Sequence, residues 1–337
     1  MSQYASVHAN PQGAGDARPT AAQIIRDESL EGELRGKVIV ITGATSGIGL
    51  ETARALATTG ANLFLTVRDT TKAEATLGSL LDSNPSRISL VEMDNGSLSS
   101  VRAAAAIILE KSNRQINILV NNAGVMGLEK LTFTVDGHEV HFATNHLSHF
   151  LLFKLLQSAL LSSSTPAFQS RVVMVASSAH RACTLGASDE YNFPKGGYNH
   201  GIAYAKSKLA NVYMANELER RYGDKGLHAT SLHPGAINSN ISRNLGPEAV
   251  EQILSNEAVV KILKSPEQGA ATTVLAAIGS AWEGTGGKYL EDCAEASRGV
   301  DDHNVFGTGY VLQTYDPEAE HRLWEDSLKI LGLEPDA

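Results

Sequence analysis

The sequence contains little cysteine, and acidic residues outnumber basic ones. Only Cys183 and Cys293 occur among the 337 residues, far apart and in no Cys-x-x-Cys pair. This excludes a disulfide framework and is typical of a reducing compartment. The 28 lysines and arginines stand against 37 aspartates and glutamates, which gives a net charge of −9 with no basic run. A nucleic-acid partner is therefore not expected.

Long apolar runs are also missing. The first 36 residues lack the apolar core of a signal peptide, and the longest apolar stretch, "FLLFKLLQSALL" at 150–161, contains Lys154 and Gln157. A stretch of this length is too short to cross a bilayer. We therefore expect a soluble, cytoplasmic protein with no membrane partner. Residues 1–20 are polar and rich in Gly, Pro and Ala, so residues 1–36 are expected to form an N-terminal arm that begins as a loose segment.

From residue 37 onward, two patterns alternate along the chain. Short runs rich in β-branched residues occur at 37–42, 62–67, 88–93, 116–121, 171–176 and 228–233. Stretches with apolar spacing near 3.6 residues separate them, as in amphipathic helices. The nearly continuous apolar strands indicate burial on both faces, and hence a parallel sheet between helices. The pattern predicts one doubly wound α/β domain over residues 37–337.

The alternation weakens in the C-terminal third of the chain. Residues 240–268 indicate one or two helices, with Gly246 and Pro247 as punctuation. A further helix is expected after Ser265, a last strand within 287–292, and a terminal helix from Asp316.

A glycine-rich turn follows the first expected strand. In "TGATSGIG" at 42–49, Gly43 allows a sharp turn, Gly47 allows close approach of a pyrophosphate, and Gly49 allows close packing of helix on strand. The phosphates would then meet the free N–H groups at the positive end of a helix. The turn predicts a dinucleotide site.

The end of the second expected strand indicates which nucleotide is preferred. An acidic residue there binds the 2′-hydroxyl of the adenosine ribose, whereas an arginine suits a 2′-phosphate. The sequence reads "LTVRD", with Val67 where the acid would stand and Arg68 next to it. Asp69 is expected to begin the following turn. NADP(H) is therefore favoured, and NAD(H) stays possible.

Three further segments should line one crevice, because ligands of open α/β sheets bind at the carboxyl ends of the strands. They are "NNAG" at 121–124, "VVMVASSAH" at 172–180 and "HPG" at 233–235. With these motifs the chain resembles the short-chain dehydrogenase/reductase family from about residue 36 to 240. The stretches "VDGHEVHFATNHLSHFLL" and "YAKSKLANVYMANELERR" make it most similar to the retinol-dehydrogenase-like branch.

The resemblance implies a single-domain Rossmann-fold enzyme that moves a hydride between a nicotinamide and a carbonyl or alcohol. It maps the catalytic residues to Asn145, Ser178, Tyr204 and Lys208. Tyr204 would give a proton to the substrate oxygen, Ser178 would hydrogen-bond it, Lys208 would hold the ribose, and Asn145 would hold a water. The cofactor-binding residues implied are Gly43, Thr45, Ser46, Gly47, Ile48, Gly49, Arg68, Asp94, Asn121, Ala123, Gly124, Tyr204, Lys208, Pro234, Gly235 and Ile237.

The pattern Tyr-x-x-x-Lys occurs twice, at Tyr191 with Lys195 and at Tyr204 with Lys208. The chemistry needs both side chains on one helix face, so that the ammonium lowers the phenol pKa from about 10. Pro194 disfavours a helix across the first pair, whereas the second pair opens a strongly helical run. The helix requirement favours Tyr204, and residues 181–203 become a loop near the pocket.

Two alternatives concern single residues. Ser177 is the rival of Ser178, since neighbours on a strand point to opposite faces, and the family motif favours the second serine. Histidines at 138, 141, 146 and 149 suggest a zinc site, but "HEVH" is one residue short of the H-E-x-x-H signature. Core or surface histidines are the preferred interpretation, and no metal is expected.

The function predicted is interconversion of a carbonyl and an alcohol on a largely apolar or aromatic small molecule. The pocket is expected between 126–128, 181–203 and 237–264. A non-catalytic NADPH-binding regulator is the alternative, and the four filled catalytic positions count against it. A homodimer or homotetramer is expected through the helices at 138–161 and 204–222. The apolar residues proposed for the pocket are Leu185, Phe193, Tyr198, Ile237, Ile241 and Leu245.

Overall fold

The computed structural model describes residues 3–187, 190–237, 240–244, 246, 248, 251 and 255–335. A central sheet has eight strands in the order β10-β9-β6-β5-β4-β1-β2-β3, and a small second sheet pairs β7 with β8. The strands are β1 (Val38–Thr42), β2 (Asn62–Val67), β3 (Ile88–Glu92), β4 (Ile118–Asn121), β5 (Ser170–Val175), β6 (Leu227–His233), β7 (Ala236–Ile237), β8 (Leu263–Lys264), β9 (Lys288–Glu291) and β10 (Ala294–Glu295).

All pairs in the large sheet are parallel except β9 with β10. The strand order reverses between β1 and β4, which is the position where doubly wound sheets bind ligands. This confirms the predicted fold class. The six strands predicted first lie within two residues of their expected bounds, and the strand expected within 287–292 is β9.

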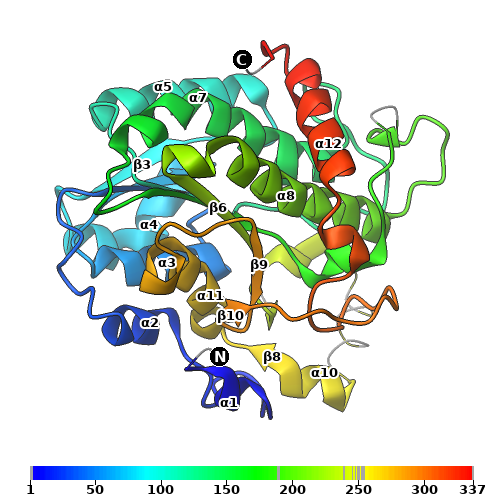
Figure 1. The fold of residues 1–337 in the computed structure, drawn as a ribbon, viewed down its shortest axis with the longest axis horizontal. Coiled ribbons are helices and arrows are strands. Elements are labelled where there is room, and N and C mark those ends of the chain that lie inside the picture. The colour runs from blue at the N-terminus through cyan, green and yellow to red at the C-terminus, as the bar shows by residue number, and fades with distance from the viewer. Residues whose placement is uncertain are drawn as a thin grey trace.

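Helices cover both faces of the large sheet, as Figure 1 shows. α3 and α11 lie on one face with α2 outside them, and α5, α7 and α8 lie on the other with α12 outside them. The helices are α1 (Ala5–His8), α2 (Ala21–Asp27), α3 (Gly47–Ala57), α4 (Thr70–Asp82), α5 (Leu98–Lys111), α6 (Val140–Phe142), α7 (Ser148–Ser163), α8 (His200–Tyr222), α10 (Glu257–Ile262), α11 (Pro266–Ile278) and α12 (Pro317–Ile330).

Strand β1 illustrates why the sheet needs both layers. Successive side chains of a strand point to opposite faces. Ile39 and Ile41 accordingly belong to the core under α3 and α11, and Val38 and Val40 belong to the core under α5 and α7. None of the four exposes more than 4% of its surface, so neither layer could be removed without exposing apolar area to water.

The C-terminal helices begin where the capping signals indicate. Ser265 caps α11 through a capping box with Gln268, and Pro266 is the first helical residue. Asp316 caps α12 by accepting a hydrogen bond from the N–H of Ala319.

Within 240–268 the structure shows a 3₁₀ turn, Asn240–Asn244, and α10, while Pro247 lies outside the described residues.

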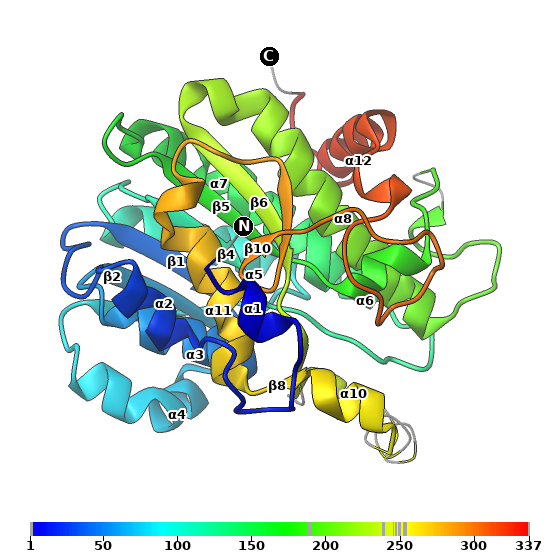
Figure 2. The ribbon, with the colours of Figure 1, turned by 60° about the horizontal axis from the view of Figure 1, so that its bottom comes forward.

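The expectation of a loose N-terminal segment is wrong for the described part of residues 1–20. α1 and the chain after it run beside α10, β8 and α11 (Figure 2). The N–H of Gly13 donates to the carbonyl of Lys261 at 2.9 Å, and Arg18 is 5% exposed. Polar composition indicated a solvated segment, but groups of Gly13, Gly15, Asp16 and Arg18 bond residues 261–268.

Helix α12 covers the groove between α7 and α8, the surface expected to meet a second subunit. Trp324 is 1% exposed and meets Phe150 edge-on, with ring centres 4.8 Å apart. The guanidinium of Arg221 lies 4.8 Å from the Trp324 ring centre. A homodimer or homotetramer through this four-helix face would have to displace α12. α12 thus covers part of this face, and the homodimer or homotetramer stays a prediction.

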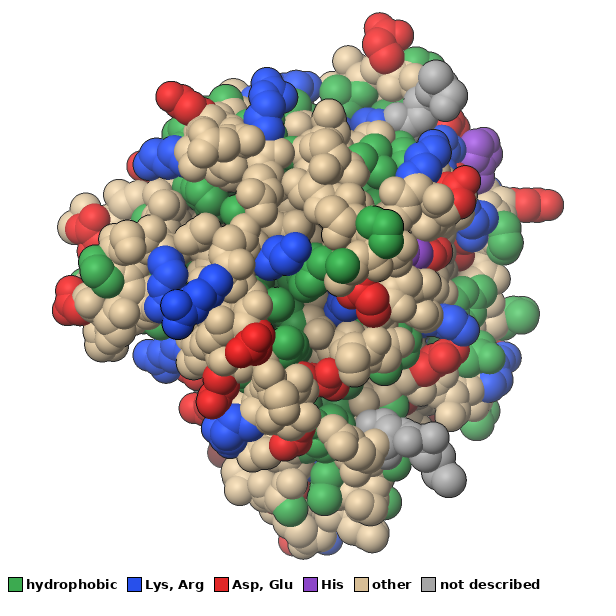
Figure 3. Space-filling view, turned by 60° about the vertical axis from the view of Figure 1, so that its left-hand side comes forward, with side chains coloured by type: hydrophobic (Ala, Val, Ile, Leu, Met, Phe, Trp, Pro, Cys, Tyr) green, Lys and Arg blue, Asp and Glu red, His purple; other side chains and the backbone are tan. Residues whose placement is uncertain are grey.

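The surface is mixed in charge. On the face that Figure 3 shows, basic and acidic side chains are interspersed, and hydrophobic side chains form small groups between them. None of the helices in the described residues has both the length and the apolar character needed to cross a membrane.

Candidate active site

A cleft of about 920 Å³ opens at the carboxyl ends of the parallel strands. Of the residues expected to bind the cofactor, all except Asn121 line it. Asn121 is fully buried, and its amide group lies against Sδ of Met174 at 3.1 Å. Its neighbour Asn122 lines the cleft instead, because the side chains of adjacent residues point to opposite sides.

The glycine-rich turn leaves room that a side chain would fill. Gly43 has a φ of +70°, and a Cβ on it would stand 2.9 Å from the Cα of Ala123. A Cβ on Gly49 would stand 2.3 Å from the carbonyl oxygen of Gly43. Gly47, at the start of α3, has a φ of +53°. Bare backbone therefore lines the cleft beside the first N–H groups of a helix, which fits the pyrophosphate of a nicotinamide dinucleotide.

Thr42 and Asn122 hold the ends of β1 and β4 together, a role that the motif did not reveal. The hydroxyl oxygen of Thr42 accepts hydrogen bonds from the N–H groups of Asn122 and Ala123, both at 2.9 Å. The amide of Asn122 donates back to the carbonyl of Thr42 at 2.8 Å. These bonds tie the end of β1, which carries the turn, to the end of β4.

Two cations stand at the end of β2. Arg68 is exposed and lines the cleft, and so does Lys72 from the first turn of α4. Asp69 caps α4 by accepting from the N–H of Lys72 at 3.0 Å, which confirms its place at the start of the next element. Its carboxylate also meets the ammonium of Lys72 at 3.2 Å. Lys72 is a cleft residue that the sequence reading missed.

Helix α8 carries Tyr204 and Lys208 four residues apart, both facing the cleft. Asn199 caps this helix, since its side chain accepts from the N–H of Ile202 at 3.0 Å. The ammonium of Lys208 donates to the carbonyl of Val175, at the end of β5, at 2.9 Å. Both side chains are buried, with 9% and 2% exposed. The predicted placement of the second Tyr-x-x-x-Lys pair on a helix is confirmed.

Burial dominates the protonation of this pair. It raises the pKa of Tyr204 to about 12, and a hydrogen bond with Ser177 opposes the rise. Burial also lowers the pKa of Lys208 to about 8. The net shift of the phenol pKa is therefore upward, opposite in direction to the lowering expected from the ammonium. The ammonium lies 5.7 Å from the ring centre and bonds a carbonyl rather than the phenol.

Asn145 lies behind the cleft in a π-helical segment, Ala143–Leu147. It is fully buried and bridges two elements, because its amide accepts from the N–H of Val125 at 2.8 Å and donates to the hydroxyl of Ser207 at 2.8 Å. A Cβ on Gly124 would stand 3.3 Å from the amide oxygen of Asn145. The wider π turn is typical of functional sites, and it brings this amide close to Lys208.

The other tyrosine of the duplicated pattern, Tyr191, lies away from the cleft. It is 4% exposed, stacks on Phe142 with ring centres 4.4 Å apart, and donates its hydroxyl to Asp326 of α12 at 2.9 Å. Phe193 has a φ of +53°, so the chain between Tyr191 and Lys195 is not helical. Tyr191 therefore anchors the C-terminal helix.

The structure brings Ser177, and not Ser178, to Tyr204. Ser177 lines the cleft and is close enough to Tyr204 to lower the phenol pKa. The hydroxyl of Ser178 donates to the carbonyl of Val305 at 2.6 Å, and its N–H donates to Nδ1 of His233 at 3.1 Å. The assignment of Ser178 to the substrate is corrected on this geometry. The acceptor, Val305, lies 127 residues later in the sequence, so no local motif could reveal the direction of the Ser178 hydroxyl.

Arg181 holds the segment that covers Ser178. It is 1% exposed, and its N–H groups reach the carbonyls of four residues and the carboxylate of Asp302. The four carbonyls belong to Val300, Asn304, Thr308 and Gly309. Its charge and every donor are thereby satisfied without water.

The apolar residues expected in the pocket divide into four groups. Ile237 and Ile241 line the cleft, Leu185 is buried in the core at 4% exposure, and Leu245 lies outside the described residues. The ring of Tyr198 meets that of Phe193 edge-on, and its hydroxyl donates to the carbonyl of Leu128 at 2.6 Å, so these two brace a loop. Phe133, Val135 and Val140 are among the apolar cleft residues that the sequence analysis did not name.

The histidines considered for zinc have separate surroundings. His141 bonds the carboxylate of Glu139 at 2.7 Å, His146 bonds the hydroxyl of Ser327 at 2.9 Å, and His149 bonds that of Thr42 at 2.9 Å. Burial lowers the pKa of His146 to about 3 and that of His149 to about 4. In the described part of the chain, no three His, Cys, Asp or Glu side chains are grouped to hold a metal ion.

A parallel sheet that reverses its order beside a glycine-rich turn, with a Tyr-Lys helix at the same edge, defines a dinucleotide-binding oxidoreductase. The family model described as short chain dehydrogenase matches residues 37–250, and the chain belongs to this family. A short-chain dehydrogenase/reductase of Penicillium roqueforti, prx1, is 47% identical over 330 residues, covering 98% of this chain and 95% of the relative.

More distant relatives agree with this placement. Human retinol dehydrogenase 12 is 35% identical, with 89% of this chain and 88% of that protein covered. Among solved structures, a Mycobacterium paratuberculosis protein has a TM-score of 0.67 at 28% identity, covering 94% of this chain and 99% of its own. The NADP complex of Pseudomonas aeruginosa RhlG has a TM-score of 0.61 at 25% identity, covering 77% of this chain and 96% of its own.

Proposed function

We propose that the protein is an NADP(H)-dependent oxidoreductase that interconverts a carbonyl and an alcohol on a largely apolar small molecule. The observation that carries the proposal is the placement of Tyr204, Lys208 and Ser177 around one end of the cleft. The glycine-rich turn forms the other end. A proton donor and a dinucleotide cradle thus share one cavity.

The cofactor choice rests on charge at the end of β2. Arg68 and Lys72 both line the cleft there, and the nearby carboxylate of Asp69 is engaged by the helix cap and by Lys72. Two cations favour a 2′-phosphate over a 2′-hydroxyl. When bound, NADPH would supply the hydride that the protein itself cannot provide.

The protein's own residues supply the proton and orient the substrate. With its pKa held at about 12, Tyr204 stays protonated at neutral pH and can donate to an oxygen that gains charge. The hydroxyl of Ser177 fixes the same oxygen by a hydrogen bond. Lys208 and Asn145 lie behind Tyr204, where the ammonium can hold the ribose and the amide can hold a water in contact with Lys208.

The substrate class follows from the other residues of the cleft. Phe133, Val135, Val140 and Ile241 present apolar surface, and Phe133 and Val135 are 49% and 86% exposed. Apolar groups exposed at a cleft favour an apolar or aromatic ligand. Retinol dehydrogenase 12, at 35% identity, is named for such an alcohol. The cytoplasmic location stays a prediction from the sequence.

Parallel titration of the purified protein with NADPH and NADH, followed by cofactor fluorescence, tests the proposal. A clear preference for NADPH, together with NADPH oxidation that depends on an apolar ketone or aldehyde, is the expected result. A preference for NADH would reverse the cofactor assignment and keep the reaction class. A folded protein that binds neither nucleotide would contradict the proposed function.

A further inference from the structure

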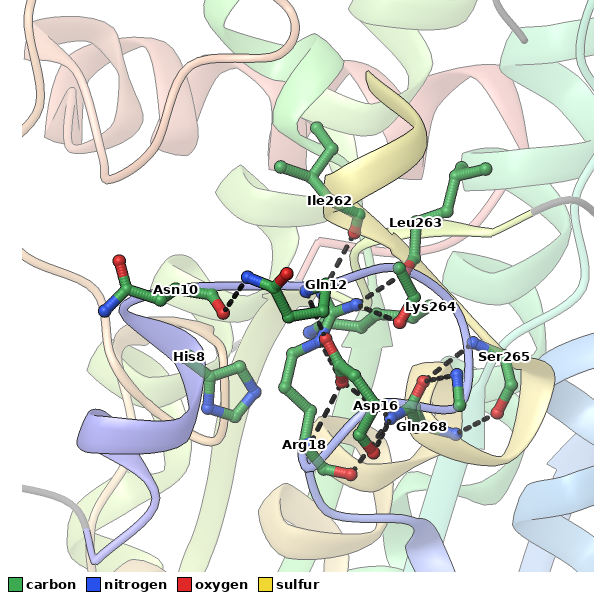
Figure 4. Close-up of polar contacts among 12 residues, drawn as sticks. His8, Asn10, Gln12, Asp16, Arg18, Ile262, Leu263, Lys264, Ser265 and Gln268 are labelled. Atoms are coloured by element: carbon green, nitrogen blue, oxygen red, sulfur yellow. Dashed lines mark hydrogen bonds and ion pairs between the residues drawn. The ribbon is translucent and has the colours of Figure 1, made fainter. Parts of the chain in front are cut away.

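The N-terminal segment contains a buried arginine that plays no part in the reaction. Arg18 is 5% exposed and lies beside α10 and α11, as Figure 4 shows. Its guanidinium donates to the carboxylate of Asp16 at 2.8 Å, to the carbonyl of Gly13 at 3.1 Å and to that of Ile262 at 3.0 Å. It also donates to the carbonyl of Leu263 at 2.5 Å. Arginine is rarely buried unless such partners satisfy its donors.

A second set of bonds ties the same segment to α11. The side chain of Gln268, 2% exposed, accepts from the N–H of Gly15 at 2.9 Å. It donates to the carbonyl of Arg18 at 3.0 Å and to Asp16 at 3.1 Å. Gln268 also belongs to the capping box of α11, so one side chain begins that helix and holds the segment. Residues 13–18 are thus fixed from two sides.

Two of the carbonyls that accept from Arg18 belong to Ile262 and Leu263, at the start of β8 in the small sheet. Leu263 and Lys264 form β8, which pairs in parallel with Ala236 and Ile237 of β7. β7 follows Gly235, and both Gly235 and Ile237 line the cleft. Only two residues in each strand maintain this pairing, so β8 depends on contacts from outside the sheet.

Side chains reinforce the same connection. A Cβ on Gly235 would stand 2.7 Å from Cδ of Lys264, so the Lys264 chain lies directly against this turn. The Lys264 ammonium bonds the carboxylate of Asp292 at 2.7 Å, and Lys264 is 3% exposed. A Cβ on Gly269 would stand 2.7 Å from Cγ1 of Ile237, which places α11 behind the same wall.

We propose that Arg18 is a positioning residue for the cofactor, acting through β8 and β7 on the cleft wall at Gly235–Ile237. The inference rests on the proposed function, since it is the dinucleotide cleft that this wall borders. Arg18 touches neither the cleft nor Tyr204. Its effect is therefore on the affinity for NADPH and not on the proton transfer.

The test compares Arg18→Met with Arg26→Met in the full-length protein. Methionine keeps the apolar stem and removes the donors that hold β8. Arg26 is an exposed arginine of α2 whose side chain bonds Gln23, so it is a matched control. We expect Arg18→Met to weaken NADPH binding by roughly tenfold, the equivalent of about one lost charged hydrogen bond. Its kcat at saturating NADPH should stay within about twofold of wild type.

Amide hydrogen exchange supplies a readout that does not depend on activity. Faster exchange in peptides covering 234–237 and 262–265 is expected in Arg18→Met and not in Arg26→Met. Asp16→Asn removes the negative charge beside Arg18 and leaves the Arg18 side chain in place, although Gln12 and Gln268 also bond this carboxylate. It should shift both readouts in the same direction by less. If Arg18→Met does not fold, the NADPH affinity and the amide exchange of Asp16→Asn test the proposal in its place.

Unchanged NADPH affinity in a folded Arg18→Met protein would overturn the inference. So would a fall in kcat with affinity preserved, or a fall in thermal stability alone. If the wild-type protein bound neither NADPH nor NADH, the proposed function would fail. The exchange experiment would then still show whether Arg18 controls the wall.

Discussion

The two ends of the cleft are built by different means. At the end formed by β1, β2 and α3, backbone lines the site. Gly43 lies in the loop after β1, and Gly47 and Gly49 lie in the first turn of α3. At the end formed by β5, β6 and α8, side chains make the site, and contacts from remote segments set their directions. The hydroxyl of Ser178 is taken by Val305, which lies far along the chain.

The difference shows which features of a site the local sequence determines and which depend on tertiary packing. A turn that needs positive φ and missing Cβ atoms restricts the residue type at each position, so its sequence is informative. A serine hydroxyl can bond any nearby carbonyl, so its type says little about its direction. The cofactor end is therefore expected to tolerate few substitutions, and the substrate end to depend on distant residues.

The largest expected effect is at Tyr204. Tyr204→Phe removes the proton donor and should lower kcat for carbonyl reduction by roughly a thousandfold or more, while leaving the dissociation constant of NADPH within about threefold. Steady-state kinetics and fluorescence titration measure the two quantities.

Tyr191→Phe is the matched control for that experiment. It removes the hydrogen bond to Asp326, so it should lower the melting temperature and leave kcat near wild type. A loss of activity in Tyr191→Phe, with Tyr204→Phe still active, would reverse the assignment of the two tyrosines.

The serine pair gives the next largest effect. Ser177→Ala should lower kcat by roughly a hundredfold, because the bond to the substrate oxygen is lost. Ser178→Ala should change kcat far less and instead loosen the segment around Val305, which limited proteolysis would detect. If Ser178→Ala is the inactive variant, the side-chain directions at the end of β5 have been assigned wrongly.

Arg68 tests the cofactor end. Arg68→Ala should weaken NADPH binding by about tenfold and leave NADH binding unchanged, because only NADPH carries the 2′-phosphate. Arg54→Ala, in α3 and paired with Glu51, is a suitable control. Equal weakening of both nucleotides would show that Arg68 supports the fold of the site and not the phosphate.

The smallest expected effect is a pH dependence. Burial lowers the pKa of Lys208 to about 8, so its ammonium is present below that pH and is lost as the pH rises through it. Tyr204 stays protonated over the same range. The kcat/KM for reduction should therefore be level at neutral pH and decline above about 8. A profile that stays level well above this pH would mean that the lysine charge is not needed.

The sequence predicted the parallel sheet, the glycine-rich turn and the helix of Tyr204, because each rests on residues close together in the chain. It failed where long-range packing decides. Polar residues around Arg18 indicated a loose segment, yet carbonyls of β8 and the residue before it bind that side chain. Nor did the sequence indicate that Trp324, in a helix predicted correctly, packs on Phe150 of a helix expected to meet a second subunit.

The central claim is that this cleft moves a hydride to a carbonyl while Tyr204 supplies the proton. The most direct measurement supplies NADPH deuterated at the transferred position with a panel of apolar ketones and aldehydes, and analyses the products by mass spectrometry. An alcohol carrying the deuterium on carbon, formed by the wild-type protein and not by Tyr204→Phe, is the predicted result. A protein that binds NADPH but forms no deuterated alcohol from any member of the panel would contradict it.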